Sequence, residues 1–154
     1  MVDEKDPAFS KPLKPIGPFL SREEAEIRRE TLGWQVTEDA GRGWRRVVPS
    51  PAPTKVVQRH MIGQAARAGH IVVAAGGGGI PIRVREDGSY SGVEAVIDKD
   101  LTSSVLATEI GASLLIILTS VPQVYVSFGK AGQQALGAVT LEEIERLWAE
   151  GHFP

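Results

Sequence analysis

An uninterrupted apolar segment, residues 71–75, runs directly into four consecutive glycines, residues 76–79. A segment that is apolar at every position is typical of a β-strand covered on both faces, as in the parallel sheet of an α/β protein. Glycines after such a strand let backbone N–H groups approach an anion closely, as a phosphate or carboxylate site requires. A tight turn or a flexible linker would account for the glycines equally well, because no Walker or dinucleotide-binding fingerprint surrounds them.

The length and composition of the chain limit the classes of protein to which it can belong. Its 154 residues fit one domain, and contents of 42% hydrophobic and 23% charged residues are typical of a globular protein. The net charge of −2 gives no general attraction to nucleic acid or to a membrane, so we expect neither partner. The chain has no cysteine and no signal-like N-terminal sequence, which predicts a cytoplasmic protein without disulfides.

From residue 54 onward, predicted helices and strands alternate. Helices are predicted over 54–68, over 100–110 and from a capping box at Thr140 onward. Strands are predicted over 71–75, 113–119 and 123–127, with an exposed hairpin over 82–92. This alternation predicts an α/β fold with a partial, open, parallel-type sheet and flanking helices. Since a sheet normally has about five or six strands, we expect the chain to be part of a larger domain.

The first 53 residues differ from the rest, because they hold seven of the ten prolines. Proline fixes the backbone and removes a hydrogen-bond donor, so residues 11–19 are expected to be extended or turned. A capping box of Ser21 and Glu24 predicts a helix to about Thr31, and residues 34–37 alternate like a short strand. We therefore expect one subdomain with a linker over residues 1–53 and an α/β part over residues 54–154.

Three segments lie where the α/β pattern predicts a ligand site. Ligands of open α/β sheets bind beyond the carboxyl ends of the strands, which selects residues 76–79 and 119–122. The third segment, residues 93–100, places Lys99 beside Asp100 at the start of a helix. A lysine held by a carboxylate suits phosphoryl transfer, because it neutralises the charge of the moving group. Alternatively, Asp98 or Asp100 only caps the helix and Lys99 is solvated.

Two other groups of residues are interpreted as structural. Arginines lie near tryptophans in one segment, but nearby carboxylates favour a salt-bridged surface over a nucleic-acid patch: Arg42, Arg45 and Arg46, with Trp34, Trp44, Glu38 and Asp39. The three histidines have no metal-ligand spacing to one another: His60, His70 and His152. We therefore expect no metal site made by the protein alone.

Four long motifs occur in a fixed order along the chain: KPIGPF at 14–19, EDAGRGWRRVVPSP at 38–51, GGGGIP at 76–81 and GVEAVIDKD at 92–100. In this order they closely resemble the carbamate kinases of the amino-acid kinase superfamily. The resemblance covers essentially the whole chain. It implies phosphoryl transfer between ATP and carbamate, in practice the formation of ATP from ADP and carbamoyl phosphate in arginine catabolism. It also implies Mg²⁺ accompanying the nucleotide, and a homodimer.

The resemblance assigns roles to individual residues. Residues 11–49 resemble a protruding lid over the carbamate site, with Lys14 as its lysine. The lysine of the family's DKD motif, here Lys99, neutralises the phosphoryl group, and the aspartate, here Asp100, organises the catalytic lysines. The loop that lies against the substrate and the transferred phosphoryl group corresponds to Gly76, Gly77, Gly78 and Gly79. The nucleotide side corresponds to Thr119, Val121 and Tyr125, with the tyrosine near the base.

Departures from the family pattern limit what we expect of the isolated chain. The family's GGNA and HGNGPQ loops and its GSMGPK-like segment are absent, and Pro122 and Ser127 replace the usual Asp and Asn. Since each positioned charge-stabilising group contributes several kcal/mol to catalysis, we expect the central and C-terminal part of a carbamate kinase, with little activity alone. The alternatives are a non-catalytic or decayed fragment that binds nucleotide or anion, and a related kinase acting on an amino acid. The lid sequence argues against the last.

Overall fold

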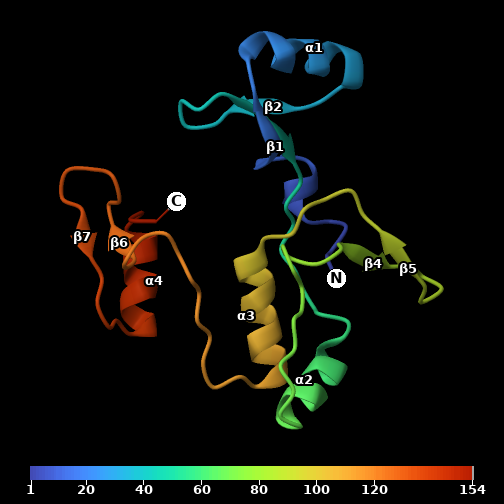
Figure 1. Cartoon of the computed structure of the whole chain (residues 1–154), viewed down its shortest axis with the longest axis vertical. Coiled ribbons are helices and arrows are strands. Elements are labelled where there is room, and N and C mark those ends of the chain that lie inside the picture. Colours follow the sequence, from blue (N-terminus) through green and yellow to red (C-terminus); the bar gives the residue numbers. More distant parts are fainter. Residues whose placement is uncertain (154) are drawn as a thin grey trace. The chain divides into compact units, whose positions relative to one another are not determined.

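In the computed structural model, which describes residues 1–153, the chain divides into two units, Met1–Leu115 and Ile116–Pro154 (Figure 1). Each unit has its own paired strands and at least one helix. The boundary expected between residues 53 and 54 lies inside the first unit and stays a prediction.

A three-stranded antiparallel sheet occupies the N-terminal part of the first unit. Its strand order is β1 (Lys14–Leu20), β3 (Trp44–Val48) and β2 (Val36–Glu38). β1 starts opposite the end of β3, with Lys14 paired to Val48, and the register shifts within β1. Lys14 therefore lies at the end of the sheet where the chain leaves β3 and continues into the rest of the first unit. The short strand predicted over 34–37 is present as β2, shifted by two residues at its start.

Helix α1 (Arg22–Leu32) follows β1 and confirms the predicted capping signals. The Ser21 side chain accepts a hydrogen bond from the Glu24 amide, and the Glu24 carboxylate accepts one from the Ser21 amide. These two bonds satisfy N–H groups that have no partner inside the helix. Gly33 ends the helix at φ 64°, a left-handed conformation that glycine adopts at little cost.

The replacement of Ser21 by alanine is expected to lower the free energy of unfolding by about 1 kcal/mol, because the Glu24 amide loses its acceptor. Urea unfolding followed by circular dichroism measures this change. Ser21→Asn is the matched control, since asparagine is an equally good N-cap and should leave stability nearly unchanged. An equal loss in both variants would show that the cap does not stabilise α1.

Helix α2 (Arg59–Arg67) begins five residues later than the start predicted at Thr54. The backbone amides of the preceding residues bond to distant partners. The Thr54 amide donates to the carbonyl of Met1, at 2.9 Å, and the Val56 amide donates to the Glu109 carboxylate, also at 2.9 Å. These bonds take the amides of Thr54 and Val56 away from a first helical turn. Because the partners are 53 positions away in the sequence, no local sequence pattern predicts the bonds.

The hairpin predicted over 82–92 is confirmed. β4 (Ile82–Val84) pairs with β5 (Tyr90–Gly92) in antiparallel register, and the turn between them contains Asp87 and Gly88. Helix α3 (Lys99–Ile110) follows, packs against α2 and ends at Gly111 in a left-handed conformation. The predicted helix over 100–110 is therefore correct to within one residue.

The strands predicted over 71–75 and 113–119 are wrong for this structure. Neither segment pairs with another strand among residues 1–153, and Ile71 and Val73 are 99% and 95% exposed. Every described strand pair is antiparallel, so the expected parallel-type sheet is not formed by these residues. The physical reason is that a strand is stable only beside a hydrogen-bonding neighbour, and these apolar segments find none.

Over residues 116–153, the second unit contains one short hairpin and one helix. The strand predicted over 123–127 is reduced to β6 (Tyr125–Val126), which pairs with β7 (Gln134–Ala135). Helix α4 (Leu141–Ala149) begins at the predicted capping box of Thr140 and Glu143. Among residues 1–153, none of the helices has the length and apolar character needed to cross a lipid bilayer.

Candidate functional site

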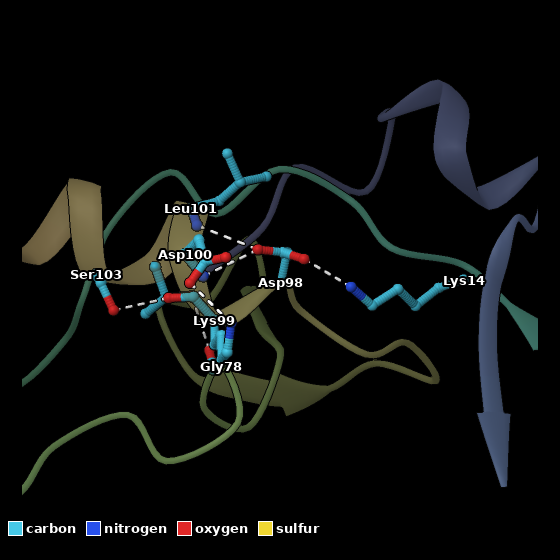
Figure 2. Close-up of polar contacts among 8 residues, drawn as sticks. Lys14, Gly78, Asp98, Lys99, Asp100, Leu101 and Ser103 are labelled. Carbon is cyan, nitrogen blue, oxygen red and sulfur yellow. Dashed lines mark hydrogen bonds and ion pairs between the residues drawn. The ribbon is translucent and has the colours of Figure 1, made fainter. Parts of the chain in front are cut away.

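Asp98 is the N-cap of α3, and its two carboxylate oxygens have different partners (Figure 2). Oδ1 accepts hydrogen bonds from the amides of Asp100, at 2.9 Å, and Leu101, at 3.3 Å. Oδ2 accepts one from the ammonium group of Lys14 on β1, at 2.6 Å. Of the two aspartates proposed as caps from the sequence, Asp98 is therefore the cap. The Asp98 carboxylate accepts from these amides, so its negative charge offsets the partial positive charge at the N-terminus of α3.

The contact with Lys14 changes the acidity of Asp98. The hydrogen bond from the Lys14 ammonium holds the pKa of Asp98 below its usual value. Burial opposes this shift, and the hydrogen bonds from the amides of Asp100 and Leu101 add to it. The two side chains are about one-third exposed, at 35% for Lys14 and 31% for Asp98. Asp98 is therefore a charged acceptor at neutral pH, and the pair is partly shielded from water.

Lys99 and Asp100 form a second, more exposed pair on the first turn of α3. The Lys99 Nζ atom lies 2.9 Å from Asp100 Oδ1, with side-chain exposures of 61% and 47%. The hydrogen bond to Asp100 raises the pKa of Lys99 above its usual value. The raised pKa keeps Lys99 cationic at neutral pH. Because an ammonium group has three donors, Lys99 also keeps donors available for an incoming anion.

The glycine loop packs directly against the residues that precede α3. Gly78 is buried at φ 126°, and an added Cβ atom would lie 2.2 Å from the carbonyl oxygen of Ile97. The buried hydroxyl of Thr102 on α3 donates to the carbonyl of Gly78, at 2.9 Å. The exposed amides of Gly77 and Gly79 donate no hydrogen bond to any group of residues 1–153. These two amides are therefore free to bind an anion.

The structure brings together the predicted site residues of the first unit. Lys14 meets Asp98, Lys99 meets Asp100, and the loop of Gly76 to Gly79 is joined to α3 through Gly78 (Figure 2). The other predicted residues, Thr119, Val121 and Tyr125, belong to the second unit.

Within the second unit, those three residues make only local contacts. The Thr119 hydroxyl donates to the carbonyl of Val121, at 2.7 Å, and the Tyr125 ring packs on Phe128 with 5.7 Å between centroids. Ser127, which departs from the family pattern, has a left-handed φ of 51°. The nucleotide-binding roles of this unit stay predictions.

Sequence reasoning missed two residues of the site, Asp98 and Thr102. Asp98 was considered only as a helix cap, although it also binds Lys14, which lies 84 positions earlier in the chain. Thr102 was not singled out, yet it is 4% exposed and fastens the glycine loop. The local signal for Asp98 was its position one residue before the helix. For Thr102, the available signal was its position one turn beyond that cap.

The structural interpretations of the arginines fit the structure. Arg42 and Arg45 both bond to Asp39, and both guanidinium groups lie over the Phe19 ring. Arg46 lies over the ring of Trp34, 4.9 Å from its centroid. Among residues 1–153, no group of three or more potential metal-ligating side chains is arranged to hold an ion.

Comparison with known proteins places this geometry in a family. The amino acid kinase family matches residues 19–153. The carbamate kinase of Thermococcus kodakarensis is 49% identical over 153 residues, which are 99% of this chain and 48% of the relative. That of Staphylococcus haemolyticus is 51% identical over 148 residues, 96% of this chain and 48% of the relative.

Solved structures agree with the sequence relatives. The carbamate kinase of Giardia lamblia bound to citric acid is 39% identical with a TM-score of 0.88, over 98% of this chain and 47% of that protein. The same enzyme bound to AMP-PNP is 42% identical with a TM-score of 0.80, over 99% and 48%. The chain spans about half the length of the curated relatives it matches. It belongs to the amino acid kinase family.

Proposed function

We propose that this chain carries the lid and phosphate-binding part of a carbamate kinase in the cytoplasm. The reaction is ATP plus carbamate to ADP plus carbamoyl phosphate and its reverse, serving arginine catabolism. The observation that carries the proposal is the convergence of two lysines and a glycine loop on the start of α3. The similarity to carbamate kinases over almost the whole chain supports the choice of substrate.

The proposed mechanism uses positive charge to stabilise the phosphoryl group during transfer. Lys99 neutralises its developing negative charge, and Asp100 holds the Lys99 ammonium in place. The free amides of Gly77 and Gly79 bind phosphoryl oxygens, as backbone nests do. Lys14 faces the carbamate, which is an anion of carboxylate type and pairs with an ammonium group.

The nucleotide belongs to the second unit in this proposal, at Thr119, Val121 and Tyr125. AMP-PNP bound to the Giardia lamblia relative supports a nucleotide as the phosphoryl donor. Mg²⁺ is commonly held by one or two carboxylates together with substrate phosphates. Residues 1–153 offer no dedicated ligand set, so we assign the ion to the nucleotide phosphates. We also propose that the complete enzyme is a homodimer.

A chimeric enzyme tests the proposed function. In it, this chain replaces the matched 153-residue segment of the Thermococcus kodakarensis carbamate kinase. The purified chimera is expected to form ATP from ADP and carbamoyl phosphate in a coupled assay, and the isolated chain is expected to be far slower. Circular dichroism and gel filtration establish that the chimera is folded. A folded chimera without turnover would contradict the proposal.

A second candidate function is a non-catalytic fragment that binds nucleotide or anion. The exposure of Ile71, Val73 and Leu118 favours it, because residues that suit a buried sheet are open to water in this chain. Calorimetry of the isolated chain with ATP, with and without Mg²⁺, separates this candidate from an inert fragment. Micromolar binding together with an inactive chimera would favour the binding fragment over the kinase.

A further inference from the structure

We propose that Asp98 is a positioning residue that fixes the lid lysine Lys14 to the start of α3, an inference that rests on the proposed function. One carboxylate does two tasks with separate oxygens: Oδ1 caps the helix and Oδ2 holds the ammonium group. Neither task competes with the other for lone pairs. The position of Lys14 is therefore set by the same group that starts the catalytic helix.

The local connections extend this link to the glycine loop. Ile97, immediately before Asp98, packs on Gly78 through its backbone carbonyl. Thr102, four residues after Asp98, bonds the carbonyl of Gly78. Asp98 thus lies between the two residues that hold the loop. A lysine bound to Asp98 is held at a fixed place relative to Gly77 and Gly79, whose amides are the proposed hydrogen-bond donors to the phosphoryl oxygens.

Other contacts do not replace this link. Within residues 1–153, Lys14 has no ion pair except that with Asp98. A backbone connection close to this link is the hydrogen bond from the Val96 amide to the carbonyl of Pro49, at 3.0 Å; Pro49 directly follows Val48, the partner of Lys14 in the sheet. That bond joins the residue after β3 to the segment before α3, but it does not involve the Lys14 side chain. Among residues 1–153, Asp98 is the one hydrogen-bond partner of the Lys14 ammonium group.

The substitution Asp98→Asn separates the two tasks. An asparagine oxygen still accepts from the amides of Asp100 and Leu101, so α3 keeps its cap. The negative charge that holds Lys14 is lost. Asp87→Asn is the matched control, because Asp87 also accepts a backbone amide, that of Ser89 at 2.9 Å, but it lies at the tip of the exposed hairpin.

The first measurement uses the full 154-residue chain and needs no catalysis. Residue-resolved acylation of lysines by a small reagent, read by mass spectrometry, should proceed several-fold faster at Lys14 in Asp98→Asn than in the parent or in Asp87→Asn. Unchanged acylation of Lys14 would overturn the proposal. If Asp98→Asn loses helix content, the carboxyl titration of Asp98 in Lys14→Met, followed by NMR, decides instead: an unchanged titration would overturn the link.

The second measurement uses the chimera and a double-variant cycle. Asp98→Asn should lower kcat/KM for carbamoyl phosphate by about 10- to 100-fold, as displaced positioning groups do. If Asp98 acts through Lys14, adding it to Lys14→Met should cause no further loss. Additive losses would overturn the positioning role. A chimera inactive in every form would count against the proposed function instead, while the acylation result would still decide the Lys14 to Asp98 link.

Discussion

Replacing Gly78 with alanine is expected to lower the free energy of unfolding of the first unit by about 2–4 kcal/mol, from backbone strain and overpacking together. Gly78 has a φ of 126°, which residues with a side chain rarely adopt. Its added Cβ would also lie 2.2 Å from the carbonyl oxygen and 2.7 Å from the carbonyl carbon of Ile97. Backbone atoms cannot turn aside as a flexible side chain does, so the loop and the start of α3 must separate.

Gly77→Ala is the control for this prediction. Gly77 lies beside Gly78 in the same loop, has no left-handed φ, and an added Cβ would have no neighbour within 4 Å. Its effect on stability should stay within about 1 kcal/mol, as for a compatible glycine-to-alanine change. Urea unfolding of both variants, followed by circular dichroism, measures the difference. Equal losses would mean that the close approach of Gly78 to Ile97 does not hold the loop in solution.

Local signals in the sequence were enough to predict the local structure. The capping boxes at Ser21 and Thr140 predicted the starts of α1 and α4, and Asp87-Gly88 predicted the turn of the hairpin. Each of these features depends on groups within a few residues of one another. The physical information is therefore present in a short stretch of sequence.

Features that depend on distant partners could not be predicted in the same way. Residues 71–75 have the composition of a buried strand, but a strand forms only where a neighbour supplies hydrogen bonds. In the described chain the segment is unpaired and Ile71 is almost fully exposed. The start of α2 was missed for a similar reason, since Glu109 binds the amide of Val56 from 53 positions away.

The contacts of the candidate site also differ in whether they could be predicted: one joins neighbours in the sequence and the other joins distant residues. Lys99 and Asp100 are adjacent in the sequence, and their contact could be expected from that. The contact between Lys14 and Asp98 spans 84 positions, and no spacing rule predicts it. The resemblance to carbamate kinases placed both lysines in one site, but it assigned no part to Asp98. The double use of the Asp98 carboxylate emerges only from the three-dimensional structure.

Lys99→Met in the active chimera is expected to lower kcat by about 10²- to 10³-fold, the usual loss when one preorganised charge-stabilising group is removed. The hydrogen bond to Asp100 raises the pKa of Lys99. The substitution therefore removes a group that is cationic throughout the neutral range. Because Lys99 is 61% exposed and methionine keeps the unbranched aliphatic stem, folding should be unaffected. Steady-state kinetics with ADP and carbamoyl phosphate measure the change.

Two further variants determine what such a loss means. Lys5→Met removes the charge of an exposed lysine without an ion pair among the described residues, and it should leave kcat unchanged. Lys99→Arg keeps the charge but replaces a compact ammonium with a planar fork, so it should recover only part of the rate. If Lys99→Met and Lys5→Met behave alike in a folded, active chimera, then Lys99 does not stabilise the transferred group. The stabilising charge at the phosphoryl group would then have to come from Lys14, the loop amides or the segments that the relative contributes to the chimera.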